Sequence, residues 1–318
     1  MIPRTTDTWA QQRERGNRFA LRLMAFIAVA FGRPVARLVL HPITCYFLAF
    51  APQARRHSAR YLERALGRPP TLADRYRHIH AFAATVLDRV YLARGRVQDF
   101  DLHLQGAPFM DALVAQGRGA LLIGAHLGSF EALHAVGASR PGLRVAMAMY
   151  PDNARLIHEA LQAIAPGFQL DIIPIGRPSS TLAVRDRLDA GGLVGMLGDR
   201  VLGQHGPRSG PPADNPRGGM VELPFLGHSA RFSDGPFRLA LLLKRRLVFM
   251  VGLYRGGARY DVRFEPLADF SAAPADAAAR DNLLRDAMQA YVHRLEGLCR
   301  EAPSNWFNFY DFWNEDAR

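Results

Sequence analysis

The stretch GRGALLIGAHLGSFEALHA, residues 117–135, brings a histidine and a carboxylate close together in the sequence. An apolar run at 120–124 has the length and composition of a buried strand, and His126 follows two residues later. Glu131 lies in the first turn of a predicted helix whose N-cap is Ser129. Two residues five apart in one helix would lie about 140° apart around its axis. His126 and Glu131 can therefore act together only if His126 lies in the loop and Glu131 reaches back toward it.

A histidine paired with a carboxylate suits general-base chemistry. A neutral imidazole takes a proton from a hydroxyl, while a carboxylate on its other ring nitrogen fixes the tautomer and stabilises the imidazolium. Ser129 lies between Gly128 and Phe130, so it does not form the GxSxG turn that carries a nucleophilic serine. The nucleophile then belongs to the substrate. The alternative is a structural histidine at the start of a helix, with no catalytic role.

Three more polar residues follow predicted strands and are candidates for substrate binding. Asp199 and Arg200 come after the apolar run 193–197, and Asn153 follows the run 144–149. In open α/β sheets, ligands bind outside the carboxyl ends of the strands. Arg200 could hold a phosphate of the acceptor or of the donor's phosphopantetheine arm, or form a structural pair with Asp199. Asn153 could line the same crevice or belong to a turn that caps a helix.

The sequence predicts no cofactor and no metal site. His78 and His80 are two residues apart on a predicted helix and so face different directions. Cys45 and Cys299 have no CxxC partner, which favours a reducing, cytoplasmic-facing location. No GxxxxGK[ST] motif occurs, and the GRG at 117–119 precedes its strand instead of following it. The fingerprints of nucleotide-binding loops are therefore absent from the sequence.

The apolar runs that would position these residues alternate with amphipathic stretches. This alternation predicts an α/β fold with a mixed sheet flanked by helices. Seven strands are expected, at 100–104, 120–124, 144–149, 170–175, 193–197, 247–253 and 260–264. Helices are expected at 71–94, 108–115, 129–136, 154–163, 181–190 and 275–300. The Gly- and Pro-rich stretch 202–219 predicts a long surface loop.

The first 70 residues differ from the rest in charge and in pattern. They carry twelve arginines against three acidic residues, and thus +9 of the chain's net charge of +11. Two apolar stretches, 23–31 and 38–52, alternate with these arginines, and neither is a continuous run of about 20 apolar residues. The pattern favours an anionic membrane surface over nucleic acid as the partner. We therefore expect membrane-interacting helices at 1–70 and an α/β domain at 71–318, the alternative for the first segment being a buried helical hairpin.

The motif HLGSFE, from His126 to Glu131, resembles the His-x4-Asp/Glu motif of the bacterial lipid A acyltransferases. This family contains the lauroyl and myristoyl transferases of lipid A biosynthesis and is lysophospholipid acyltransferase-like. Other stretches resemble the family in the same order along nearly the whole chain. The basic N-terminal segment, with its apolar stretches, resembles the family's N-terminal anchor, and Asp199 resembles the Asp at the end of one of its strands. The stretch LPFLG at 223–227 resembles the family's Phe-x-Gly signature. The stretch PSNWFNFYDFW at 303–313 resembles its Pro-x-x-Trp ending.

The resemblance implies an O-acyltransferase on the cytoplasmic face of the inner membrane. Its donor would be an acyl thioester of acyl carrier protein or of CoA, and its acceptor a hydroxyl of a lipid or glycolipid. His126 and Glu131 would be catalytic, and substrate would contact Asp199, Arg200, Asn153 and Gly227. The tail is acidic and aromatic where the family's is basic, which leaves the acceptor open between lipid A, another glycolipid and a pigment or polyene lipid. A non-catalytic lipid-binding protein and a lipid esterase are the alternatives.

Overall fold

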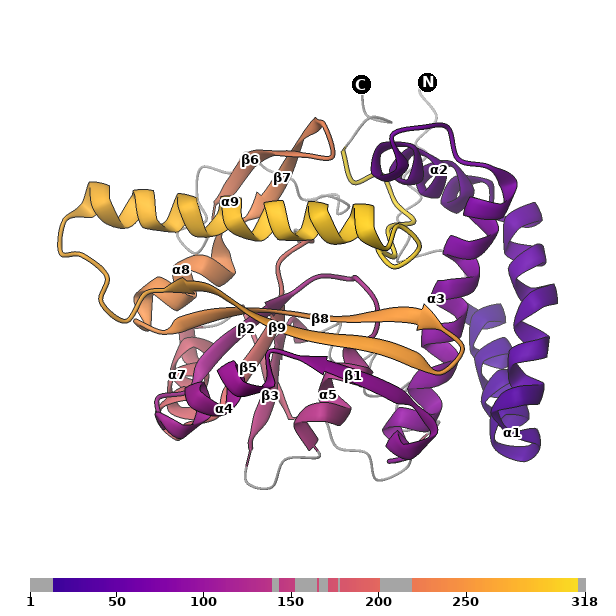
Figure 1. Ribbon diagram of the computed structural model, residues 1–318, viewed down its shortest axis with the longest axis horizontal. Helices are drawn as coiled ribbons and strands as arrows, with labels where there is room; N and C mark the ends of the chain where they lie inside the picture. Colours follow the sequence, from indigo (N-terminus) through magenta and orange to yellow (C-terminus); the bar gives the residue numbers. More distant parts are fainter. Residues whose placement is uncertain are drawn as a thin grey trace, which may run out of the picture.

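The chain folds around one mixed β-sheet of seven strands with helices on both faces (Figure 1). The computed structural model describes residues 14–138, 143–151, 165, 171–176, 178–200 and 219–313. The strand order is β1-β9-β8-β2-β5-β3-β4. Within this sheet β8 pairs antiparallel with β9, and every other neighbouring pair is parallel. The bounds are β1 Asp101–Gln105, β2 Ala120–Gly124, β3 Val145–Met149, β4 Ile172–Pro174, β5 Leu193–Leu197, β8 Arg246–Gly256 and β9 Arg259–Asp269.

All seven predicted strands of the sheet are confirmed, because the buried strands carry nearly continuous apolar runs. Strands β2 and β5, for example, read ALLIG and LVGML, and nearly all of their residues are buried. Strands β8 and β9 extend beyond the predicted runs as a long antiparallel ribbon. A second, two-stranded sheet of β6 Met220–Phe225 and β7 His228–Ser233 was not predicted. The predicted helix 154–163 lies outside the described residues, as does nearly all of the predicted loop 202–219.

Two apolar clusters cover the two faces of the sheet. On one face lie α2 Pro52–Leu66, α7 Pro178–Asp189, α8 Gly235–Leu242 and α9 Ala277–Glu301, together with the β6–β7 hairpin. On the other face lie α1 Glu14–Phe50, α3 Leu72–Ala93, α4 Ala107–Ala115 and α5 Phe130–Ala138. A short 3₁₀ helix, η2 Val97–Asp99, links α3 to β1. Because each strand alternates its side chains between the two faces, both clusters draw on the same strands.

Helix α1 packs along α3 at one end of the sheet (Figure 1). It is kinked at Gly32, whose φ of 78° lies in the left-handed region that only glycine adopts readily. After the kink, Ala36 and Leu40 face the domain and are buried. The predicted boundary at residue 70 falls between α2 and α3, and Tyr61 of α2 belongs to the same apolar cluster as the sheet. No single helix among the described residues is long and apolar enough to cross a bilayer. The segment 30–50 and helix α2, which meet at 94°, are together long and apolar enough to do so, by length and composition only.

Candidate active site

His126 lies at the carboxyl end of β2, in the loop that leads into α5. Its ring Nδ1 is 2.9 Å from Oδ1 of Asp199, and its backbone N–H donates to Oδ2 of the same carboxylate at 2.9 Å. Asp199 comes just after β5, which pairs in parallel with β2, and Gly198 N–H extends that pairing by donating to the Gly124 carbonyl at 3.0 Å. The histidine and the carboxylate therefore lie side by side at the carboxyl ends of two adjacent parallel strands.

Asp199 is ionised in this setting. Its side chain is 1% exposed, whereas the ring of His126 is 31% exposed and reachable by substrate. Burial raises the pKa of Asp199, but His126, Arg200 and the indole N–H of Trp306, which donates to Oδ2 at 3.0 Å, together lower that pKa to about 2. A carboxylate only accepts hydrogen bonds, so the proton of a neutral His126 lies on Nδ1. Nε2 is then the nitrogen that can accept a proton.

Glu131 does not hold the position that the sequence prediction assigned to it. Its carboxylate forms an ion pair with Arg89 of α3, with Nε and Oε1 2.6 Å apart, and accepts the hydroxyl of Ser129 at 3.3 Å. The carboxylate on Nδ1 of His126 is that of Asp199, which the sequence prediction placed in substrate binding. Glu131 points from the first turn of α5 toward α3, so it ties two helices together. Ser129 caps α5 as predicted, because its hydroxyl accepts the Ala132 N–H at 3.2 Å.

The loop between His126 and α5 is held against strand β8. Ser129 N–H donates to the Gly252 carbonyl at 2.7 Å. Gly128 has a φ of 73°, and a Cβ at this position would lie 2.0 Å from the Gly252 carbonyl oxygen. Glycine is therefore required at 128, both for the backbone conformation and for the close approach. The contact holds the loop and the start of α5 against β8, which lies on the opposite side of β2 from β5.

The C-terminal tail supplies contacts that the sequence prediction missed. Phe307 N–H donates to the His126 carbonyl at 2.9 Å, and Gly128 N–H donates to the Asn305 carbonyl at 2.9 Å. Trp306 lies between these two bonds and is 1% exposed. The sequence analysis identified this aromatic segment only by its resemblance to a Pro-x-x-Trp family ending. A tryptophan at the end of a chain gives no sequence signal that its indole contacts a carboxylate over one hundred residues away.

The remaining predicted site residues are placed differently. The guanidinium of Arg200 lies over the ring of Tyr310, 5.3 Å from its centroid, and Nη2 donates to the Phe307 carbonyl at 3.4 Å. Arg200 is exposed, so its charge is available beside Asp199. Gly227 lies in the turn of the β6–β7 hairpin with a φ of 81°, which accounts for the glycine without any substrate. Asn153 lies outside the described residues.

A small apolar pocket lies between α4, α5 and one face of the sheet. Its wall along α5 begins at Phe130, four residues after His126. The wall continues with Leu133 and His134, while Met147 and Met250 form its floor on the sheet. Burial lowers the pKa of His134 despite the opposing effect of Glu131, so the pocket is uncharged at neutral pH.

No model of a known protein family and no curated protein matches this chain. Within the described part of the chain, no group of three or more His, Cys, Asp or Glu side chains is arranged to hold a metal ion.

Proposed function

We propose that the protein is an O-acyltransferase in which His126, oriented by Asp199, acts as the general base. The observation that carries the proposal is the hydrogen bond between Nδ1 of a partly exposed histidine and a buried, ionised carboxylate. Nε2 would remove the proton of an acceptor hydroxyl as its oxygen attacks the carbonyl carbon of an acyl thioester. A C–O bond forms, the C–S bond breaks, and the imidazolium returns its proton to the departing thiolate. Asp199 stabilises the imidazolium between these two steps.

The apolar pocket beside α5 supports a fatty acyl group as the transferred group. Its lining is almost entirely apolar and includes Phe130, the first residue of α5 after the loop that carries His126. An acyl chain bound there would lie along α5, whose first turn follows the loop that carries His126. Each buried methylene would contribute about 0.8 kcal/mol to binding, so a long chain gains more from this pocket than a short one. The donor that follows from the resemblance to the lipid A acyltransferases is acyl carrier protein or acyl-CoA.

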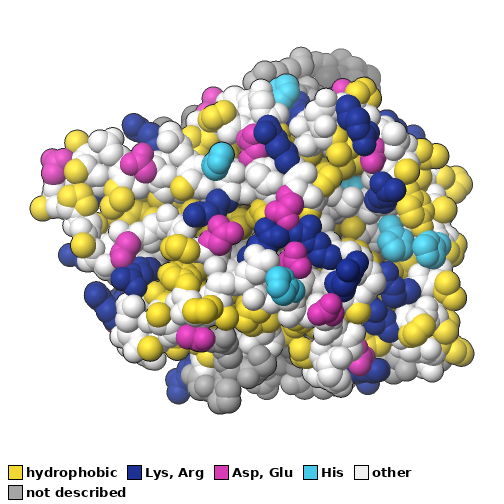
Figure 2. Space-filling view, in the orientation of Figure 1, with side chains coloured by type: hydrophobic (Ala, Val, Ile, Leu, Met, Phe, Trp, Pro, Cys, Tyr) yellow, Lys and Arg dark blue, Asp and Glu magenta, His cyan; other side chains and the backbone are white. Residues whose placement is uncertain are grey.

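The outward face of α1 supports a membrane-bound acceptor. Between residues 30 and 50, the exposed side chains include no Asp, Glu, Lys or Arg, and apart from His41 and Tyr46 they are apolar or cysteine. They include Phe31, Leu38 and Phe50, each more than 60% exposed. Figure 2 shows hydrophobic side chains along the edge of the molecule that α1 forms. An exposed helix face without charge suits the interface of a bilayer, and we place the protein at the cytoplasmic face of the inner membrane. The acceptor would be a hydroxyl of a lipid or glycolipid at that surface.

A covalent acyl-enzyme has no support among the described side chains near His126. The hydroxyl of Ser129 is engaged in capping α5 and in contacting Glu131. Cys299 is fully buried, and burial raises the pKa of its thiol far above the ordinary value. A nucleophilic cysteine requires a lowered pKa and access to substrate, and Cys299 has neither. We therefore propose direct transfer to the acceptor, which also separates this function from that of an esterase.

The test is acyl transfer by the purified protein from radiolabelled acyl carrier protein, or labelled acyl-CoA, to total membrane lipid. His126→Gln should lower the rate by about 10² to 10⁴, the usual cost of losing a general base. His293→Gln on the exposed face of α9 is the matched control and should retain the wild-type rate. Denaturing mass spectrometry after incubation with donor alone should find no acyl group on the protein. Lipid acylation by His126→Gln at the wild-type rate, or a stoichiometric acyl adduct, would exclude this mechanism.

A further inference from the structure

The segment 305–307 runs across the loop that carries His126. Asn305 and Phe307 make backbone hydrogen bonds to either side of that loop, and Trp306 pairs with Leu127 in an antiparallel bridge between them. The His126 peptide is consequently held at both ends, its N–H by Asp199 and its C=O by Phe307. A loop held at both ends has little freedom to change the direction in which the imidazole points.

Trp306 extends this hold to the carboxylate. Its indole N–H donates to Oδ2 of Asp199, the oxygen that also accepts the His126 backbone N–H. Its own carbonyl accepts a hydrogen bond from Nε2 of the buried His78 at 2.8 Å. Because Nε2 of His78 must donate to a carbonyl, its Nδ1 accepts the hydroxyl of Ser58 at 2.7 Å. The backbone of Trp306 is thus fixed by side chains of α2 and α3.

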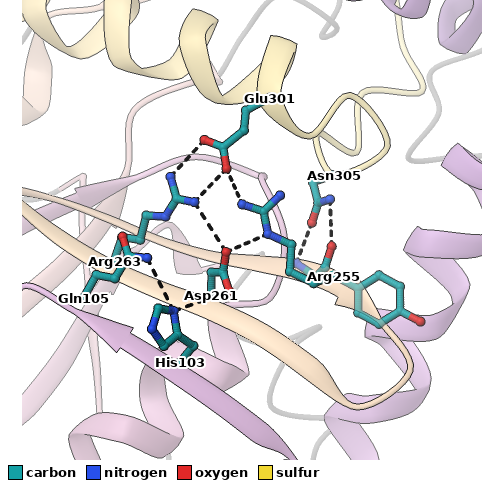
Figure 3. A network of polar contacts seen from close by, with 8 residues as sticks. His103, Gln105, Arg255, Asp261, Arg263, Glu301 and Asn305 are labelled. Carbon is teal, nitrogen blue, oxygen red and sulfur yellow. Dashed lines mark hydrogen bonds and ion pairs between the residues drawn. The ribbon is translucent and has the colours of Figure 1, made fainter.

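The segment is also anchored to strand β8. The Asn305 side chain accepts the Tyr254 backbone N–H at 2.7 Å and donates to the Tyr254 carbonyl at 3.1 Å. Four residues earlier, Glu301 at the end of α9 contacts both Arg255 and Arg263, and Asp261 lies between the two arginines (Figure 3). These contacts fix the end of α9 on the β8–β9 ribbon, and with it the start of the tail.

We propose that 305–307 is a positioning strap for the catalytic pair, and that Trp306 is a positioning residue that acts on His126 through Asp199. The inference rests on the proposed role of His126 as the base. Three donors share the two oxygens of Asp199, and the indole is the one donor of the three that does not belong to His126. Without the indole, Oδ2 keeps only the His126 backbone N–H, and the carboxylate is held less firmly in the orientation that directs Nδ1.

Core packing alone is the competing explanation, because the rings of Tyr61, Phe225, Phe312 and Trp313 surround Trp306. Trp313 supplies the matched control. It is 8% exposed and belongs to the same aromatic cluster, but among the described residues its indole nitrogen has no hydrogen-bond partner. Replacing either tryptophan by phenylalanine removes a similar volume from the same cluster. Only Trp306→Phe removes a donor from Asp199.

The experiment compares Trp306→Phe with Trp313→Phe in the full-length protein by acyl transfer and by ¹⁵N NMR of the His126 ring. Trp306→Phe should lower the turnover rate by about tenfold, since a hydrogen bond to a charged group has been lost. It should also reduce the fraction of His126 in the Nδ1–H tautomer. Trp313→Phe should leave the ring signals unchanged and the rate within about twofold of wild type. Equal effects of the two substitutions on rate and on ring signals would show that Trp306 acts by packing alone.

A second measurement leaves Trp306 in place and applies even if Trp306→Phe does not fold. The chain has three tryptophans and therefore three indole N–H resonances. The Trp306 resonance should shift in both His126→Gln and Asp199→Asn, while that of Trp313 should not. An unshifted Trp306 resonance overturns the strap, whatever the activity of the variants. A shifted resonance together with full activity of His126→Gln would instead overturn the catalytic role of His126 and leave the coupling in place.

Discussion

Replacing Asp199 by asparagine is expected to reverse the tautomer of His126 in addition to removing a charge. Oδ2 of Asp199 accepts two N–H donors, from the His126 backbone and from Trp306, whereas Oδ1 accepts only Nδ1. An asparagine has one oxygen and one NH₂ group. Its oxygen will take the position with two donors, so the NH₂ group will face Nδ1. Nδ1 must then accept a hydrogen bond, and the ring proton moves to Nε2, the atom that has to receive the substrate proton.

The expected loss follows from this geometry. An amide in place of the carboxylate behind a catalytic histidine costs about 10⁴ in turnover when it selects the wrong tautomer. Asp199→Asn should therefore approach His126→Gln in severity, and the double substitution should be little worse than either alone, because the two residues act as a unit. Glu131→Gln removes a charge from the ion pair with Arg89 and should cost stability, about 1–3 kcal/mol for a partly buried pair. Its turnover should stay within about threefold of wild type, since the carboxylate on Nδ1 is that of Asp199.

The assay is single-turnover acyl transfer at saturating donor, with the unfolding free energy of each variant measured in parallel. The pH dependence gives an independent check. Because the folded pKa of Asp199 is about 2, below the ordinary value of 3.8, its contribution to stability is present above about pH 4 and is lost as the pH falls toward 2. Asp199→Asn should lack this component of acid unfolding. If Glu131→Gln is inactive while Asp199→Asn retains activity, the pairing read from the structure is wrong and the one first expected from the sequence is right.

Three further predictions concern the rest of the molecule. Arg33→Met should lower the unfolding free energy by about 3–5 kcal/mol in chemical denaturation, because it leaves the fully buried Asp88 without its cation. A loss below about 1 kcal/mol, which is usual for a surface pair, would contradict a structural role of this ion pair. Leu38→Glu should weaken sedimentation with anionic vesicles, whereas Leu242→Glu on α8, which is equally exposed, should not; equal effects would place the membrane contact elsewhere. Met147→Ala should enlarge the apolar pocket. The kcat/KM for a donor one carbon longer, relative to the donor that the wild type prefers, should then rise by about fourfold, because one buried methylene contributes about 0.8 kcal/mol. An unchanged chain-length profile would exclude this pocket as the acyl site.

The sequence was a reliable guide where burial alone determines the residue pattern. Strands β2 and β5 are buried on both faces, so each has an apolar run of the right length and no competing helical period. The β6–β7 hairpin was missed because it contains Pro224, and because its turn at Leu226 and Gly227 was interpreted as a family signature. A proline within an apolar run argues against a strand when only the sequence is known.

The pairing of His126 could not be derived from the sequence for a topological reason. Glu131 is five residues away and Asp199 seventy-three, so nearness in sequence favours the wrong carboxylate. What brings Asp199 close is the position of β5 next to β2, and the seven predicted strands can be ordered in many ways. Asp199 was recognised as a candidate because it ends a strand. Its role required the strand order.

The contacts of the arginines in α1 could not be derived from the sequence either, and they change how membrane attachment has to be tested. Their alternation with apolar residues predicted a basic surface against the membrane, but Arg33 and Arg37 turn inward. Arg33 binds both oxygens of Asp88, and both arginines donate to the Gly257 carbonyl at the tip of the β8–β9 ribbon. The residues between them that face outward are apolar. Deleting residues 1–52 would therefore strip a buried carboxylate of its partner and unfold the domain together with any anchor. Membrane binding can be separated from folding only by substituting outward-facing residues such as Leu38, which leave the contacts of Asp88 intact.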